Sequence, residues 1–209
     1  MLSSSQQDEH GPTSAAATQI AAPPEAAPPD KRARAGLEGE RVTRETLLRL
    51  PPMFRSFANV EVPNPRNRAG HNEADLLIAG PSALFVLEVK HHRGKVFGSE
   101  HASRWSVTHH EGCPLEPTRN AIAQVKKLVW LLREVFEAHG QRTWVQGIVV
   151  FSHPAAEIHI DRTNTPCLRL DAVVPYIRSY APRGGCDRGT VGLMQRLMRE
   201  SDGRRRLAA

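Results

Sequence analysis

The alternation of apolar and polar residues predicts a helix and then several strands in the first half of the chain. Residues 31–50 place apolar side chains near one helical stripe, and Pro51 ends the helix because proline cannot continue it. The stripe consists of Leu37, Glu40, Arg44, Leu47 and Leu48. Apolar runs then predict strands at 57–62, on both sides of a turn at 80–82, and at 94–98 and 104–107.

The second half contains the strongest helical pattern, at residues 117–139. Charged residues lie opposite a wide apolar stripe, and Gly140 suits the C-terminal cap. The stripe comprises Ile122, Val125, Val129, Leu132 and Phe136, widened by Ala121, Leu128, Leu131 and Val135. A buried strand at 144–151, a short strand at 167–170, a short helix at 171–179 and a terminal helix at 190–199, capped by Thr190, complete the pattern.

This order of elements predicts one α/β (α+β) domain at 31–200, with a mixed central sheet flanked by helices. Residues 1–30 are rich in Ala and Pro and lack aromatic side chains, so we expect a disordered tail that is a candidate for binding a protein partner. Residues 201–209 predict a second disordered tail, which is basic.

The charge of the chain is uneven. Its formal net charge is +6, but residues 1–30 hold four of the 22 acidic residues and none of the 28 basic ones. The rest therefore carries 28 basic against 18 acidic residues, which favours a polyanionic partner such as nucleic acid. A basic surface without any partner is the alternative.

Other compositional features exclude several classes of protein. Three scattered cysteines without C-x-x-C spacing argue against a disulfide framework and a structural zinc site. No apolar run approaches the roughly 20 residues that span a membrane, and the first ten residues lack the pattern of a secretory signal. We therefore expect a cytoplasmic protein without a membrane partner.

The turn at 80–82 also sets the register of a hairpin. If the hairpin is symmetric about the bond between Pro81 and Ser82, the numbers of opposed residues sum to 163. Asp75 then faces Glu88, and Glu73 faces Lys90. Because successive side chains of a strand point to opposite faces, Asp75, Glu88 and Lys90 share one face of the sheet.

Two opposed carboxylates repel each other, so a sheet gains nothing from this arrangement by itself. A divalent cation between Asp75 and Glu88 reverses the sign of the interaction, and ligation by oxygen alone suits Mg²⁺ or Mn²⁺. The Lys90 ammonium could then orient a water molecule or stabilise a phosphate. A purely structural alternative is an ion pair between Glu73 and Lys90, with Asp75 as a polar residue near the turn.

Each of the two main helices carries a polar residue on its apolar side. Glu40 lies among the apolar positions of its stripe, and a buried carboxylate is costly unless it is paired or binds a metal. Alternatively, Glu40 pairs with Arg44 on a solvated face. Gln124 lies in line with Ala121 and Leu128, so its amide needs a partner either in the core or at an active site at the sheet edge.

In combination, these features resemble the nuclease-related domain (NERD) family of the PD-(D/E)XK nuclease superfamily. The resemblance covers residues 31–139. The matching stretches are Gly36-Leu37-Glu38-Gly39-Glu40, Glu73-Ala74-Asp75-Leu76-Leu77, Phe85-Val86-Leu87-Glu88-Val89-Lys90 with Arg93-Gly94-Lys95-Val96, Trp105, and Pro117 at the start of the long helix. The chain departs from the family pattern at Asn120, where the family has Gln; a Gln follows one turn later as Gln124.

The resemblance implies a restriction-endonuclease-like core and metal-dependent hydrolysis of DNA. Asp75 and Glu88 would bind Mg²⁺ or Mn²⁺, and Lys90 would position water and stabilise the developing phosphorane charge. Glu40 would hold a second metal or a metal-bound water, and Asn120 or Gln124 would supply a polar contact from the helix. Arg66, Arg68 and Arg93 would hold the phosphate backbone. The alternative is a non-catalytic nucleic-acid-binding or regulatory domain that retains the nuclease fold.

Overall fold

The computed structural model describes residues 30–109, 112–181, 183 and 185–208. The tail expected at residues 1–30 therefore lies outside the described residues, except for Asp30. The Asp30 carboxylate accepts a hydrogen bond of 2.7 Å from the Ala33 N–H. Asp30 thus caps the first helix and does not belong to the tail.

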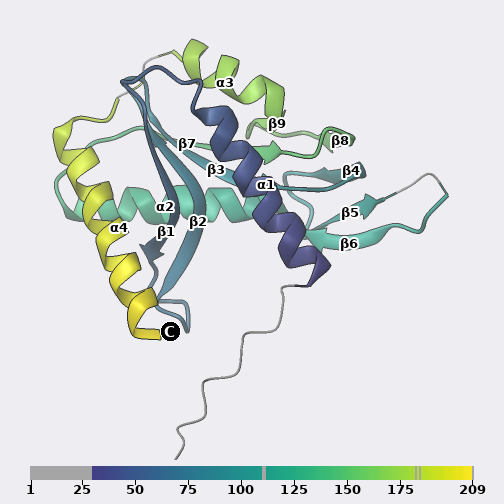
Figure 1. Ribbon diagram of the computed structural model, residues 1–209, viewed down its shortest axis with the longest axis horizontal. Coiled ribbons are helices and arrows are strands. Elements are labelled where there is room, and N and C mark those ends of the chain that lie inside the picture. Colours follow the sequence, from purple (N-terminus) through teal and green to yellow (C-terminus); the bar gives the residue numbers. More distant parts are fainter. Residues whose placement is uncertain (1–29, 110–111, 182, 184, 209) are drawn as a thin grey trace, which may run out of the picture.

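The strands form two mixed sheets, whereas the sequence pattern predicts one. The first sheet has the order β1-β2-β3-β7-β9, with the bounds Arg55–Pro63, His71–Ala79, Leu84–Lys90, Val145–Phe151 and Cys167–Arg169. The second has the order β6-β5-β4-β8, with the bounds Glu116–Arg119, Arg104–Thr108, Gly94–Ser99 and Ala156–Asp161. It extends from one end of the first sheet (Figure 1). The sequence does not reveal this separation, because β4 pairs with β8, which is distant along the chain.

Helices cover both faces of the first sheet (Figure 1). The helices α1 (Lys31–Leu47) and α3 (Leu170–Ser179) pack on one face, and α2 (Ala121–Ala138) and α4 (Arg188–Ala208) pack on the other. Alternate residues of β3 therefore enter two cores: Leu84 and Val86 on the α2 side, and Phe85 and Leu87 on the α1 side. The predicted α+β class, with helices flanking a mixed sheet, is confirmed. None of the described helices has the length and apolar character to cross a bilayer.

The long helix begins later than the pattern predicts. Pro117 lies in β6, opposite Ser106 of β5, at the edge of the second sheet. An edge strand tolerates proline because its outer side donates no hydrogen bonds to the ladder. The helix α2 starts at Ala121 with Asn120 as its N-cap, and Gly140 follows its last turn with a φ of +67°, as expected for a C-terminal glycine.

The buried face of α1 also differs from the predicted stripe. Leu37 and Leu48 are 57% and 82% exposed, whereas Gly39, Thr43 and Leu47 are buried. These three residues follow i, i+4 spacing, and two of them are small. The helix therefore approaches the sheet more closely than a stripe of leucines would allow, and hydrophobic periodicity alone does not detect such a face.

The predicted disordered tail at 201–209 is wrong up to residue 208, because α4 continues to Ala208. Ser201 is fully buried, and its hydroxyl donates to the Leu197 carbonyl at 2.8 Å and accepts from the Glu61 N–H at 3.0 Å. This contact ties the helix to β1. At its start, Asp187 accepts a hydrogen bond from the Thr190 N–H, so Asp187 and not Thr190 caps the helix.

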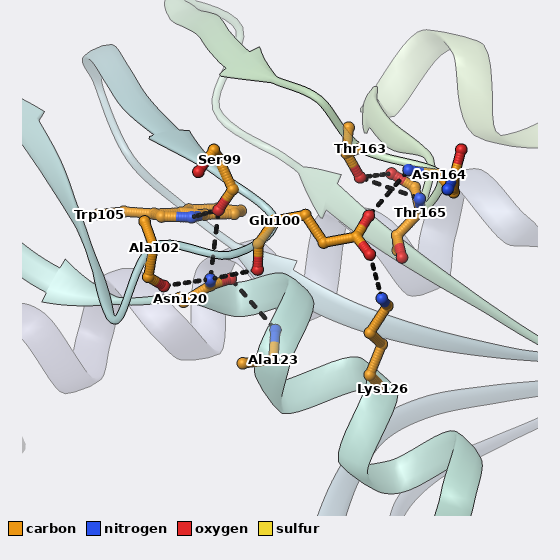
Figure 2. A network of polar contacts seen from close by, with 10 residues as sticks. All are labelled: Ser99, Glu100, Ala102, Trp105, Asn120, Ala123, Lys126, Thr163, Asn164 and Thr165. Atoms are coloured by element: carbon orange, nitrogen blue, oxygen red, sulfur yellow. Dashed lines mark hydrogen bonds and ion pairs between the residues drawn. The ribbon is translucent and has the colours of Figure 1, made fainter.

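A polar network joins the start of α2 to the β4–β5 turn and to residues 163–165 (Figure 2). Asn120 accepts from the Ala123 N–H at 3.1 Å and donates to the Ser99, Glu100 and Ala102 carbonyls. The Glu100 carboxylate, 8% exposed, accepts hydrogen bonds from the Lys126 ammonium and, at 2.8 Å, from the Asn164 N–H. These bonds, chiefly the one from Lys126, lower the pKa of Glu100 to about 2.

The lowered pKa of Glu100 predicts how stability depends on pH. Its contribution is complete above its ordinary pKa of 4.5 and is lost as the pH falls from 4.5 towards 2. We expect Glu100→Gln to lower the free energy of unfolding at pH 7 by about 1–2 kcal/mol, near the low end for charged hydrogen bonds because Lys126 is half exposed. Urea unfolding at pH 7, 5, 4 and 3 should show the difference from wild type shrinking below pH 4.5. A difference that stays constant with pH would contradict this assignment.

Candidate active site

The strands β2 and β3 pair in the register that the turn predicts, and the pairing ends at the acidic residues. Cα partners run from Ala79 and Leu84 to Leu76 and Leu87, and every pair of numbers sums to 163. Beyond Leu76 the ladder stops, and the Asp75 carboxylate accepts a hydrogen bond of 2.8 Å from the Val89 N–H. The side chain of Asp75 thus replaces a backbone acceptor and is held against β3.

The other neighbour of β2 is irregular at the same point. The β1–β2 register runs from Arg55 to Pro63 but omits the pair of Asn59 and Asp75, and Asn59 has a left-handed φ of +52°. In a regular strand, residues three apart point to opposite faces. Here Phe57 and Val60 enter the same core, as do Ala74 and Leu77. The alternation of side chains between the two faces is therefore interrupted in both strands, at Asn59 in β1 and at Asp75 in β2. As a result, Asp75 is paired with neither neighbouring strand.

Glu88 and Lys90 follow the regular alternation of β3. They continue the series of Leu84 and Val86, so both side chains lie on the α2 side of the sheet. Glu88 is only 5% exposed, and its Oε1 lies 2.6 Å from the Lys90 Nζ. The ammonium thus compensates a carboxylate that would otherwise be buried without a counter-charge.

The carboxylates affect one another. Burial, and then the charge of Glu88, raise the pKa of Asp75 to about 6, although the Val89 N–H and the Lys90 charge act in the opposite direction. Burial also raises the pKa of Glu40, followed by the charges of Asp75 and Glu73. The helix α1 therefore brings Glu40 towards the acidic strands, and within the described part of the chain Glu40 forms no ion pair with Arg44.

The approach of α1 depends on Gly39, a residue that hydrophobic patterning does not single out. A Cβ on Gly39 would lie 2.7 Å from the His91 Cβ and 2.8 Å from the Ser152 Oγ. Ser152 is in turn fixed, because its N–H donates to the Lys90 carbonyl at 3.0 Å and its hydroxyl bonds the His91 Nδ1 at 2.9 Å. Gly39, one residue before Glu40, thus allows α1 to pack closely against the end of β3. The sequence signal that could have identified Gly39 is its place in the stretch Gly36-Leu37-Glu38-Gly39-Glu40, which resembles the family pattern.

The donor set fits a hard divalent cation. Among the described residues, no group of three or more His, Cys, Asp and Glu side chains is arranged to hold a metal ion. Mg²⁺, however, keeps several of its waters and often binds only one or two carboxylates. Asp75 and Glu88 offer oxygen ligands alone, and a cation would relieve the repulsion that helps to raise the pKa of Asp75. Glu40 is the candidate third carboxylate.

Lys90 and its neighbours Val89 and His91 line a cleft of about 740 Å³ between α1, the end of β3 and the second sheet. Four permanently charged basic residues line the cleft, and they outnumber its one carboxylate, Glu116, which lies 3.5 Å from Arg32: Lys31, Arg32, Lys90 and Arg93. Burial lowers the pKa of His92 to about 4, and the positive charge of Lys90 is the next cause. The cleft therefore has a positive potential that suits an anionic ligand.

The structure distributes the remaining candidate residues differently from the sequence expectation. Arg93 lines the cleft with Lys90. Arg66 instead lies over the Trp130 ring, 4.8 Å from its centroid, in a separate groove between α2 and α4, and Arg68 is exposed on the same loop. The Asn120 amide is engaged in capping α2 (Figure 2). The Gln124 Oε1 is buried and has no hydrogen-bond partner among the described residues.

Comparison with known proteins gives one match. The family model described as nuclease-related domain (NERD) matches residues 35–152, more than half of the chain. The matched segment runs from within α1 to the end of β7 and contains every site residue predicted from the sequence, whereas Lys31 and Arg32 of the cleft precede it. No curated protein and no solved structure matches the chain.

The two glycines of α1 give a matched test of the helix position. Gly39→Ala should lower the free energy of unfolding by about 1–3 kcal/mol, because the new methyl group must displace His91 or the helix. Gly36→Ala has open space around its Cβ, so it should be neutral or stabilise by up to about 1 kcal/mol. Urea unfolding of both variants checks this. Equal stability of the two variants would contradict the close packing at Gly39.

Proposed function

The chain belongs to the nuclease-related domain family, and from that premise we propose that it hydrolyses phosphodiester bonds of DNA with the help of Mg²⁺ or Mn²⁺. The observation that carries the proposal is the position of Asp75 and Glu88 beside Val89 and Lys90, two residues that line a basic cleft. In the reaction, water adds across one P–O bond and leaves a phosphate monoester and a hydroxyl group.

Asp75 and Glu88 would hold the cation, and Glu40 would hold a water molecule bound to it or a second cation. When bound, the cation supplies Lewis-acid polarisation of the phosphate and lowers the pKa of a bound water. Lys90 has a separate task. Its ammonium, now paired with Glu88, would turn to the phosphate and stabilise the negative charge that grows on the phosphorane.

The remaining residues would bind and orient the substrate. Lys31, Arg32 and Arg93 line the cleft and would contact backbone phosphates, which positions a strand without reading its sequence. Arg66 and Arg68 would contact the substrate only where it extends beyond this cleft. The buried Gln124 Oε1 needs a donor, and a water molecule in the active site would provide one.

A second candidate function is a non-catalytic nucleic-acid-binding or regulatory domain. The observation that favours it is the lack of a ready set of three metal ligands among the described residues. The basic cleft would then bind the phosphate backbone without cleaving it. A cytoplasmic location and a protein partner of the N-terminal segment stay predictions.

A cleavage assay distinguishes these functions. We expect the protein to degrade plasmid, linear or single-stranded DNA in Mg²⁺ or Mn²⁺ and not in EDTA. Glu88→Gln and Lys90→Gln should each lower the rate about a hundredfold or more, because one removes a charged ligand and the other the charge that stabilises the transition state. At a limiting concentration of the cation the rate should also rise as the pH increases through about 6, because Asp75 of the metal-free protein must lose its proton before it can bind the cation.

Glu137→Gln is the matched control, since Glu137 is exposed on α2 and does not line the cleft. It should retain the wild-type rate. Binding of DNA without cleavage in any metal would support the second function. Failure to bind or cleave DNA would overturn both.

A further inference from the structure

A second pocket adjoins the basic cleft on the other side of two histidines. It has a volume of about 490 Å³ and lies between α1, the end of β7 and the start of α3. His91 and His153 line both cavities, so the pocket and the cleft meet at these side chains. Part of its wall, at Arg169–Asp171, lies outside the segment that the family model matches.

The chemical character of this pocket differs from that of the cleft. Val42, Phe151, Pro154 and Leu170 give it apolar walls. Two of its charged groups neutralise each other, since Arg169 lies 3.8 Å from Asp171 and donates to the Ala156 and Pro154 carbonyls at 2.9 Å. Glu38 is paired with Arg41 at 2.7 Å. The pocket therefore suits a largely uncharged group more than a phosphate.

The two histidines are held in place with polar atoms that could recognise such a group. Their rings meet edge to face with centroids 4.9 Å apart. The His153 Nδ1 accepts from the Ala155 N–H at 3.1 Å, so in the neutral ring the proton sits on Nε2 and can be donated. Arg49 also lines the pocket, and it alone of the charged side chains there makes no side-chain hydrogen bond or ion pair with described residues.

We propose that this pocket accepts one unpaired nucleobase of a strand whose phosphates lie in the Lys90 cleft, which makes single-stranded nucleic acid the preferred substrate. The proposal rests on the proposed function. A volume of about 490 Å³ is in the range of small-ligand sites, and a base can enter only after leaving the stack of a duplex. Arg49 would stack on the base, as guanidinium groups commonly do.

Binding measured in EDTA separates this proposal from catalysis. Fluorescence anisotropy compares a labelled single-stranded oligonucleotide with its duplex, and a series of oligonucleotides carries one abasic residue at successive positions. We expect the single strand to bind more tightly. We also expect one abasic position to weaken its binding about 5- to 150-fold, the range for loss of one stacked base.

Two variants test the pocket directly, and Arg178→Gln is the matched control. Arg178 is exposed on α3 and lines neither cavity, so its loss removes one positive charge without touching the pocket. Arg49→Gln should weaken binding of the single strand several-fold more than Arg178→Gln does, and both should affect the duplex equally. Thr46→Phe, which fills the pocket without changing charge, should abolish the effect of the abasic residue.

The outcomes also distinguish the two proposals. Binding that depends on Arg49 and on one base, with no cleavage in Mg²⁺ or Mn²⁺, supports the pocket and contradicts the nuclease activity. The opposite outcome is cleavage together with equal affinity for single strand and duplex, no sensitive abasic position, and equal effects of Arg49→Gln and Arg178→Gln. That outcome overturns the proposed base-binding pocket and leaves the nuclease activity in place.

Discussion

The arrangement of this domain depends on one electrostatic constraint, which is the placement of the Asp75 and Glu88 carboxylates beside each other where little solvent reaches them. Burial and the charge of Glu88 raise the pKa of Asp75 to about 6. The folded state thus holds this proton more tightly than the unfolded state, and the pair costs stability as the pH rises from about 4 to 6. Glu100 has the opposite effect, since its lowered pKa stabilises the fold above pH 4.5. The Val89 N–H and the Lys90 ammonium offset part of the cost at the acidic pair. A domain selected for stability alone would have no reason to keep two neighbouring carboxylates that lower its stability.

The parts of the fold that local chemistry determines were predictable from the sequence. A turn at residues 80–82 sets the register of β2 and β3, and the wide apolar stripe determines the buried face of α2. The rest depends on packing between distant segments. The close seat of Gly39 on His91 and Ser152, the pairing of β4 with β8 and the anchoring of Ser201 on β1 follow from the tertiary structure. The same is true of Arg66, which lies on Trp130 instead of in the cleft. The local sequence pattern gives the type of each of these residues, but not the distant residues that each one contacts.

The position of the site follows from an irregular strand, β2, that lies beside a regular one, β3. Both ladders of β2 omit Asp75, while β3 continues in regular alternation and carries Glu88 and Lys90. The small residues Gly39 and Thr43 on the buried face of α1 allow Glu40 to approach, and the same helix lines both a basic cleft and a mostly neutral pocket, which meet at His91 and His153. This division matches the two chemical halves of a nucleic-acid strand, which are its charged backbone and its uncharged bases. The proposed activity and the proposed preference for single strands therefore arise from one feature, the position of α1 on the end of β3.

The most direct test of this account is a titration of the Asp75 side-chain carboxyl followed by ¹³C NMR, in the absence and presence of Mg²⁺. The account predicts an apparent pKa of about 6 without the cation, and a lower value when Mg²⁺ is added or when Glu88 is replaced by Gln. An apparent pKa near the ordinary value of 3.8 that responds to neither change would contradict it, because Asp75 and Glu88 would then not form a pair that binds a cation.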